Sequence, residues 1–298
     1  MADVSASMND APPRRVGAAS LVRRILRDRL AALALLILVI IVIGALFAPW
    51  LAPFDPYETT RRPFLPPFWS DGHVPRHKLG TDAQGRDMLS RLLYGARLTL
   101  VMGLASVLLG GVLGALFGML SAFYRRIDPY VMRFADILLS FPAILLGLAL
   151  AAVVGPGLTA IVIALSIATI PDVARVTRGA AVVVMAQDYI EAGRALGLPD
   201  RTLIWRYLGL NCISSVFVFL TLRFGQVILI GAALSFLGLG VRTPEAELGM
   251  MASLGRDSLF FAPHISLLPS LGIVLIVLCV NILGDALRDV LDPRLRNT

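Results

Sequence analysis

Long uncharged apolar runs constrain this chain more than any other feature of its sequence. The first extends from Leu30 to Leu51, and similar runs recur toward the carboxyl end. A helix needs about 20 mostly apolar residues to cross the hydrocarbon core of a bilayer. Only 16% of the residues are charged, whereas soluble domains carry roughly 25%. We therefore expect an all-α membrane protein that holds one membrane domain.

The apolar runs predict six membrane-spanning helices. They are expected at residues 30–51, 98–123, about 137–154, from Leu158 onward, within 212–240 and within 265–284. Pro142 predicts a kink in the third helix. The fourth is expected to continue out of the membrane, because the charged residues Asp172, Arg175 and Arg178 follow Pro171 on the same helical pattern.

Three parts of the chain surround or contain these spans. Residues 1–29 form a polar amino-terminal segment, and the following run is too long for a typical signal peptide and lacks a clear cleavage site. Residues 52–97 are expected to form an external loop. The loop is expected to end in a surface helix from Asp87 to Arg97, whose apolar residues are Met88, Leu92 and Leu93. Residues 98–298 form the core domain with five spans.

The distribution of basic residues predicts the orientation. Six spans place both termini on one side, which holds 17 arginines and lysines against 9 on the other. Basic loops favour the cytoplasm, so we expect both termini there. The net charge of +7 is spread beside apolar spans rather than gathered in one patch, which argues against nucleic-acid binding.

The basic residues also exclude nucleotide hydrolysis by this chain. Lys78 is the only lysine and stands in "RHKLG", without the upstream glycines of a phosphate-binding loop.

His73 and His77 are separated by Pro75, which argues against a helical metal site. Ser235 in "LSFLGLG" lacks the pattern of a hydrolase nucleophile. We expect neither a catalytic site nor a metal site nor a cofactor.

Three glycines lie four residues apart in the second span: Gly110, Gly114 and Gly118. This spacing puts them on one helix face and predicts close packing against another helix. The alternative is that glycine is simply frequent in membrane helices.

A short polar segment, residues 185–211, interrupts the apolar pattern on the cytoplasmic side. A helix is expected from Met185 to Leu196, ended by a left-handed Gly197. Pro199 prevents continuation, and Asp200 is expected to cap a second helix. That helix has the apolar face Leu203, Ile204, Tyr207 and Leu208. The pattern is compatible with a rigid lever or with an ordinary connection.

This segment resembles the cytoplasmic signature of the permease subunits of ABC importers. Glu191, Ala192 and Gly197 match at the family's spacing, and Gly193 replaces its second alanine. The tail departs from the signature at Tyr207, Gly209 and Leu210. Residues 79–97, 234–241 and 281–296 also resemble the C-type subunit of dipeptide, oligopeptide and nickel importers. The family usually has tryptophans near Leu248 and His264, which this chain lacks.

The resemblance implies a fold, partners and a role. The fold is the type I importer permease with six spans in the bacterial inner membrane. The partners are a homologous permease, two ATPases that bind ATP, and an extracytoplasmic binding protein. Glu191, Ala192, Gly193, Gly197 and Asp200 would belong to a coupling helix that docks on an ATPase. The cargo is a dipeptide, an oligopeptide or a related solute such as a nickel chelate or glutathione.

Two polar residues within the fifth span are candidates for lining the pathway. Arg223 and Gln226 lie where a charge is expensive unless it faces a cavity or a partner. Alternatively, Arg223 extends toward the cytoplasmic interface. Two other functions stay open: an ion-coupled secondary transporter that works alone, and a membrane scaffold that transports nothing.

Overall fold

The computed structural model describes residues 26–291, in which the regular elements are helices joined by loops, with one isolated bridge between Thr81 and Asp87. The helices are α2 (Arg29–Leu46), α3 (Ala48–Leu51), α4 (Met88–Phe123), α5 (Asp128–Ser140), α6 (Ala143–Val154), α7 (Leu158–Met185), α8 (Asp188–Ala195), α9 (Asp200–Thr202), the π-helix η1 (Leu203–Gly209), α10 (Leu210–Phe236), α11 (Leu248–Leu254), the 3-10 helix η2 (Arg256–Ser258) and α12 (His264–Leu291). Most of the expected amino-terminal segment 1–29 lies outside the described residues.

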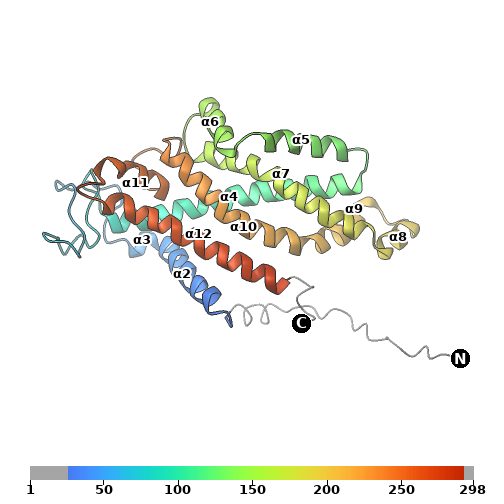
Figure 1. Ribbon diagram of the computed structural model, residues 1–298, viewed down its shortest axis with the longest axis horizontal. Helices are drawn as coiled ribbons and strands as arrows, with labels where there is room; N and C mark the ends of the chain where they lie inside the picture. Colours follow the sequence, from blue (N-terminus) through green and yellow to red (C-terminus); the bar gives the residue numbers. More distant parts are fainter. Residues whose placement is uncertain (1–25, 292–298) are drawn as a thin grey trace.

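Five of these helices are long and apolar enough to cross a membrane: α2, α4, α7, α10 (continuing η1) and α12. A sixth span results if α5 and α6, which meet at an angle of 89°, are counted together. Figure 1 shows α5 lying along α7, and α6 turning sharply from the direction of α5. At one end of the bundle lie α11 and the loop before α4, and at the other lies α8, while α2 and α12 stop short of α8.

The third span differs from the expected kinked helix over 137–154. The helix begins earlier, at Asp128, and stops at Ser140, and Pro142 precedes a new helix instead of bending an old one. Proline lacks an N–H and disfavours helical geometry in the residue before it, here Phe141. With the chain extended at Phe141, the two helices separate completely.

The surface helix expected over 87–97 is instead the beginning of α4, which continues unbroken to Phe123. The carboxylate of Asp87 caps it by accepting a hydrogen bond from the Ser90 N–H. Arg91, which lies within this stretch, is only 1% exposed. Its guanidinium donates to the carbonyl oxygens of Pro56 and Pro244 and lies 3.4 Å from Asp82. Because these acceptors take the place of water, the charged side chain of Arg91 can be buried without ending the helix.

The three glycines of α4 all face α7. A methyl group added at Gly110 would lie 2.5 Å from the Ser166 carbonyl oxygen, and one at Gly114 would lie 2.7 Å from that of Ile170. One added at Gly118 would collide with the Ala174 carbonyl oxygen. The two backbones therefore approach too closely for any side chain at these positions.

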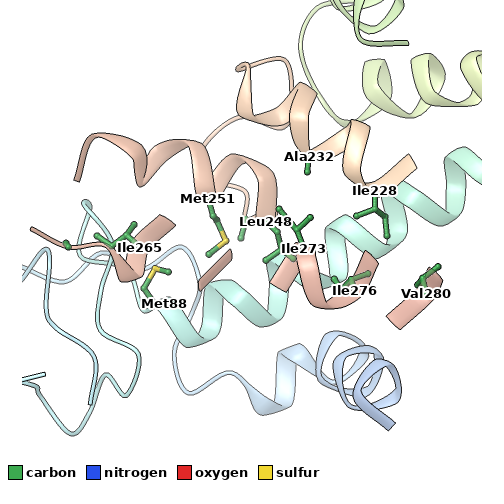
Figure 2. Close-up of a cluster of buried hydrophobic side chains, with 11 residues drawn as sticks. Met88, Ile228, Ala232, Leu248, Met251, Ile265, Ile273, Ile276 and Val280 are labelled. Carbon is green, nitrogen blue, oxygen red and sulfur yellow. The ribbon is translucent and has the colours of Figure 1, made fainter. Parts of the chain in front are cut away.

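An apolar cluster packs four helices together, from the end of the bundle opposite α8 toward its middle. Figure 2 shows side chains from α4, α10, α11 and α12 meeting there, namely Met88, Ile228, Ala232, Leu248, Met251, Ile265, Ile273, Ile276 and Val280. The fully buried carboxylate of Glu247 caps α11 and accepts hydrogen bonds from the N–H groups of Gly249 and Met250, both at 2.8 Å. This end of the molecule is thus a compact, capped core.

Candidate functional site

Helix α8 lies outside the bundle at the junction of α7 and η1. Its first turn contains Asp188 and Glu191 and its last turn contains Arg194, an arrangement that complements the helix dipole. Ile190 and Gly193 are buried, and the other side chains of the helix are exposed. The helix therefore packs inward along one narrow stripe and presents the rest of its surface outward.

A left-handed residue ends α8, as the sequence predicted. Gly197 has φ +73°, and its N–H donates to the Arg194 carbonyl at 2.9 Å. The N–H of Leu198 donates to the Gly193 carbonyl at 3.1 Å. These two bonds form a Schellman motif, which satisfies carbonyls at the helix end that would otherwise lack partners. The turn after α8 is thereby fixed in direction.

Gly193, where the family signature has alanine, forms the contact between α8 and η1. A methyl group added here would lie 3.0 Å from Leu203 Cδ2 and 3.3 Å from Leu198 Cδ1. Leu203 is 1% exposed, so little space exists for it to move. The glycine thus allows α8 to seat closely on the following segment.

Aromatic and polar contacts brace this segment against two long helices. The rings of Tyr189 and Tyr207 stack at 6.2 Å. The guanidinium of Arg194 lies 5.4 Å from the ring centre of Phe123, at the end of α4. These contacts connect α8 to α4 and to η1, which leads directly into α10.

Asp200 has a different place from the expected one. It is the first residue of α9 instead of its cap, and its carboxylate makes no capping bond. The Tyr124 hydroxyl donates to Asp200 Oδ2 at 3.0 Å, which raises the pKa of Tyr124. Since Pro199 cannot donate an N–H, the backbone enters α9 one residue earlier than the sequence suggested, and the carboxylate is left to bind α4.

The outward surface of α8 combines apolar and acidic groups. Leu196 is 82% exposed and Tyr189 is 40% exposed. Glu191 and Ala192 are also exposed. We call these four residues the α8 face. The α8 face therefore exposes the apolar surface of Leu196 and part of Tyr189 beside the carboxylate of Glu191.

A charged cluster lies halfway along the bundle, where the sequence had singled out Arg223 and Gln226. Arg223 Nη2 lies 2.5 Å from Asp172 Oδ2 and Nη1 lies 2.7 Å from Gln226 Oε1. Nη2 also donates to the Ala168 carbonyl at 3.2 Å. The guanidinium therefore reaches across to α7 instead of extending toward the end of its own helix. Sequence reasoning missed Asp172 as its partner.

Further ion pairs continue from Asp172 along α7. Arg175 pairs with Asp136 at 2.6 Å, and Arg178 pairs with both oxygens of Asp128 at 2.5 Å. Asp172, Arg175 and Arg178 recur every three residues and so lie near one another on the helix surface. Their ion pairs connect α7 to α10 and to α5.

Comparison with known proteins identifies the chain. Residues 110–297 match the family described as the binding-protein-dependent transport system inner membrane component, and residues 19–67 match the N-terminal membrane domain of oligopeptide transport permease C. The chain belongs to this permease family. It is a multi-pass subunit of an ABC importer in the inner membrane, not an enzyme. Permeases of this kind work with an ATPase and a substrate-binding protein.

Several curated permeases resemble the chain over nearly its whole length. The di/tripeptide permease DppC of Pseudomonas aeruginosa (strain UCBPP-PA14) is 45% identical over 88% of this chain and 88% of its own length. A putative peptide permease of Brucella abortus is 42% identical over 92% and 91%. The glutathione permease GsiD of Pectobacterium atrosepticum is 40% identical over 92% and 90%.

Solved structures of two ABC transporters contain a chain with a similar fold. A chain of the MetNI methionine ABC transporter, in an inward-facing conformation, superposes with a TM-score of 0.57. It is 21% identical, and the match covers 69% of this chain and 98% of that one. A chain of an amino acid ABC transporter gives a TM-score of 0.51 at 20% identity, covering 65% and 91%.

Proposed function

We propose that this permease forms half of a pathway that imports peptides or a related small solute. The relatives named for di/tripeptides, peptides and glutathione support this cargo class. The other half would come from a homologous permease, with two ATPases on the cytoplasmic side and a binding protein outside. Six spans with both termini in the cytoplasm fit this assembly, and the separation of α8 from the long outer loop in Figure 1 supports the orientation.

The α8 face would dock on an ATPase, with Glu191, Ala192, Gly193, Gly197 and Asp200 as the coupling residues. Glu191 and Ala192 are exposed for contact, Gly193 seats the helix and Gly197 fixes its end. Asp200 ties the element to α4. The observation that carries this proposal is that α8 is short, fixed at its end and braced on both sides. A displacement of such an element moves the helices attached to it.

The ion pairs of α7 give that movement a route into the bundle. Helix α7 ends at Met185 and α8 begins at Asp188, so only two residues separate the two elements. Arg178 and Arg175 hold α5, and Asp172 holds α10. Closure of the ATPases would displace α8 and α7, and with them α5 and α10, so that the pathway changes the side on which it opens.

Arg223, Gln226 and Asp172 would line the pathway. The two charged side chains are 17% and 27% exposed in the single chain, which leaves part of their surface available toward a second permease. A zwitterionic peptide crossing between the subunits would meet both signs of charge at this level. The pair would then offer transient partners to the charged ends of the peptide.

Reconstituted uptake tests the coupling role. The Glu191→Arg variant, assembled with its partners in liposomes, should lose most ATP-dependent peptide uptake. Asp285→Arg is the matched control, because Asp285 is an exposed acidic residue of α12 that lies outside α8. Normal uptake by Glu191→Arg would refute the coupling role. Uptake by the permease without any ATPase would instead indicate an ion-coupled carrier.

A further inference from the structure

The outer loop between α3 and α4 encloses a cavity of about 370 Å³. Three arginines line it, Arg61, Arg62 and Arg76, and the carboxylates in its wall are Glu58 and Asp87. The loop lies at the end of the bundle farthest from α8 and extends beyond the ends of α2 and α4 (Figure 1). No part of the coupling mechanism uses these residues.

The segment that carries two of the arginines is held in place by its backbone. Both the N–H and the hydroxyl of Thr60 donate to the Gly85 carbonyl, at 3.0 and 2.7 Å. The Thr81 hydroxyl donates to the Arg62 carbonyl at 2.8 Å. Gly85 has φ +78°, and any side chain there would collide with the Thr60 carbonyl oxygen. Residues 60–62 are thus fixed from both flanks, although they belong to no helix.

Arg76 is fixed by an aromatic stack. Its guanidinium lies 5.1 Å from the ring centre of Phe54, which in turn stacks on His77 at 4.7 Å. His77 Nδ1 lies 2.9 Å from Asp87 Oδ1, and the other oxygen of Asp87 accepts from the N–H and hydroxyl of Ser90. Asp87 is therefore engaged by His77 and by the start of α4, and it forms no ion pair with any of the three arginines.

The three arginines have no ion-pair partner among residues 26–291. By contrast, Arg86 and Arg91 in the same region both pair with Asp82, at 2.7 and 3.4 Å. The three arginines outnumber the two carboxylates in the cavity wall, Glu58 and Asp87, which leaves a local positive charge that an anion would stabilise. The planar fork of donors in arginine matches a carboxylate or a phosphate.

We infer that this cavity receives a carboxylate side chain of the extracytoplasmic binding protein. The inference rests on the proposed function, which places such a protein at this end of the molecule. A protein carboxylate is favoured over a lipid phosphate because the arginines lie in the polar loop beyond the ends of the spans. The cavity would orient the binding protein over the pathway before substrate is released.

Binding measurements test this inference. The assembled importer is placed in phosphatidylcholine nanodiscs, and its Kd for the purified binding protein is measured at several salt concentrations. The Arg61→Glu/Arg62→Glu and Arg76→Gln variants should each weaken binding, by about tenfold for the double reversal at low salt, and should flatten the salt dependence. Glu58→Gln should tighten binding, an effect that a merely structural role would not produce. Size-exclusion profiles verify that the variants assemble.

Lys78→Glu is the matched control, since Lys78 is an exposed cation of the same loop that does not line the cavity. Its Kd should stay near that of the wild type. Equal Kd values and salt slopes for wild type and cavity variants would overturn the inference and leave the proposed function intact. Phosphatidylglycerol added to the nanodiscs could also be compared. If it abolished binding of the binding protein to the wild-type importer but did not change binding to the cavity variants, the inference would be overturned in favour of a lipid site. Failure of the wild-type importer to bind the protein at all would refute the proposed function itself.

Discussion

The guanidinium of Arg223 in α10 lies 2.5 Å from the carboxylate of Asp172 in α7, and each residue stands near the middle of its helix. A charge in the middle of a membrane-spanning helix is costly unless it is paired, so each side chain offsets part of the desolvation cost of the other. The pair joins the helix that precedes α8 to the helix that follows it. This contact is where a movement of the α8 segment would reach the middle of the bundle.

Removing one member of this pair should destabilise the protein more than removing both. Breaking a fully buried pair costs about 3–5 kcal/mol, and the partial exposure of these side chains makes a smaller loss expected. Thermal unfolding in nanodiscs should therefore give a lower Tm for Arg223→Met than for Arg223→Met/Asp172→Leu. Equal Tm values for the single variant and the wild type would contradict the pairing.

The packing of α4 on α7 predicts the effect of larger residues at its glycines. Gly114→Leu would place side-chain atoms within contact distance of the Ile170 backbone and should prevent normal packing, seen as a large fall in Tm or in membrane yield. Gly179→Ala is the control, because no atom lies within 4 Å of its added methyl group. That change should stabilise α7 by about 0.5–1 kcal/mol. A well-folded Gly114→Leu protein would refute the close approach.

Gly197 should be sensitive to substitution for conformational reasons alone. Nothing lies within 4 Å of a methyl group added there, yet its φ of +73° disfavours alanine by about 1–2 kcal/mol. Gly197→Ala should speed hydrogen exchange in α8, while Gly197→Asn should be nearer the wild type because asparagine tolerates this geometry. Unchanged exchange in Gly197→Ala would show that the left-handed turn does not hold the helix end.

The Tyr124–Asp200 contact predicts a pH dependence above neutrality. The hydrogen bond to Asp200 raises the pKa of Tyr124 from its ordinary value of 10.0. A group with a raised folded-state pKa contributes stability that is complete below its unfolded pKa and is lost as pH rises through the folded pKa. The tyrosinate absorbance of Tyr124 is identified as the part that is absent from the Tyr124→Phe variant. This absorbance should therefore appear above pH 10.0 in the wild type. In the Asp200→Asn variant it should appear at a pH nearer 10.0. Identical titrations with and without Asp200 would contradict the contact.

The sequence predicted those features that depend on local chemistry. The start of α7 at Leu158 followed from the glycines before it, and the end of α8 from the need for a left-handed residue. The shared face of Gly110, Gly114 and Gly118 followed from helical periodicity alone. Each of these depends on neighbours in the chain, so no knowledge of the fold was needed.

Features that depend on distant partners were not predictable in the same way. The burial of Arg91 within the expected surface helix could not be foreseen, because its acceptors, Pro56 and Pro244, are far away in sequence. The pairing of Asp172 was hidden in the same way, because its partner, Arg223, lies on another helix. The arginine cavity was equally hidden, since the loop that forms it is ordered by hydrogen bonds between residues more than 15 positions apart.

Cross-linking from the α8 face tests the central claim most directly. Leu196→Cys places a thiol on the most exposed apolar side chain of this face, and the native Cys212 and Cys279 are buried. In the assembled importer, a short bifunctional reagent should join residue 196 to the ATPase, and ATP binding should change the yield. Phe260→Cys, fully exposed at the opposite end, should give no ATPase product. The absence of any ATPase cross-link from residue 196 in an importer active in uptake would contradict the account.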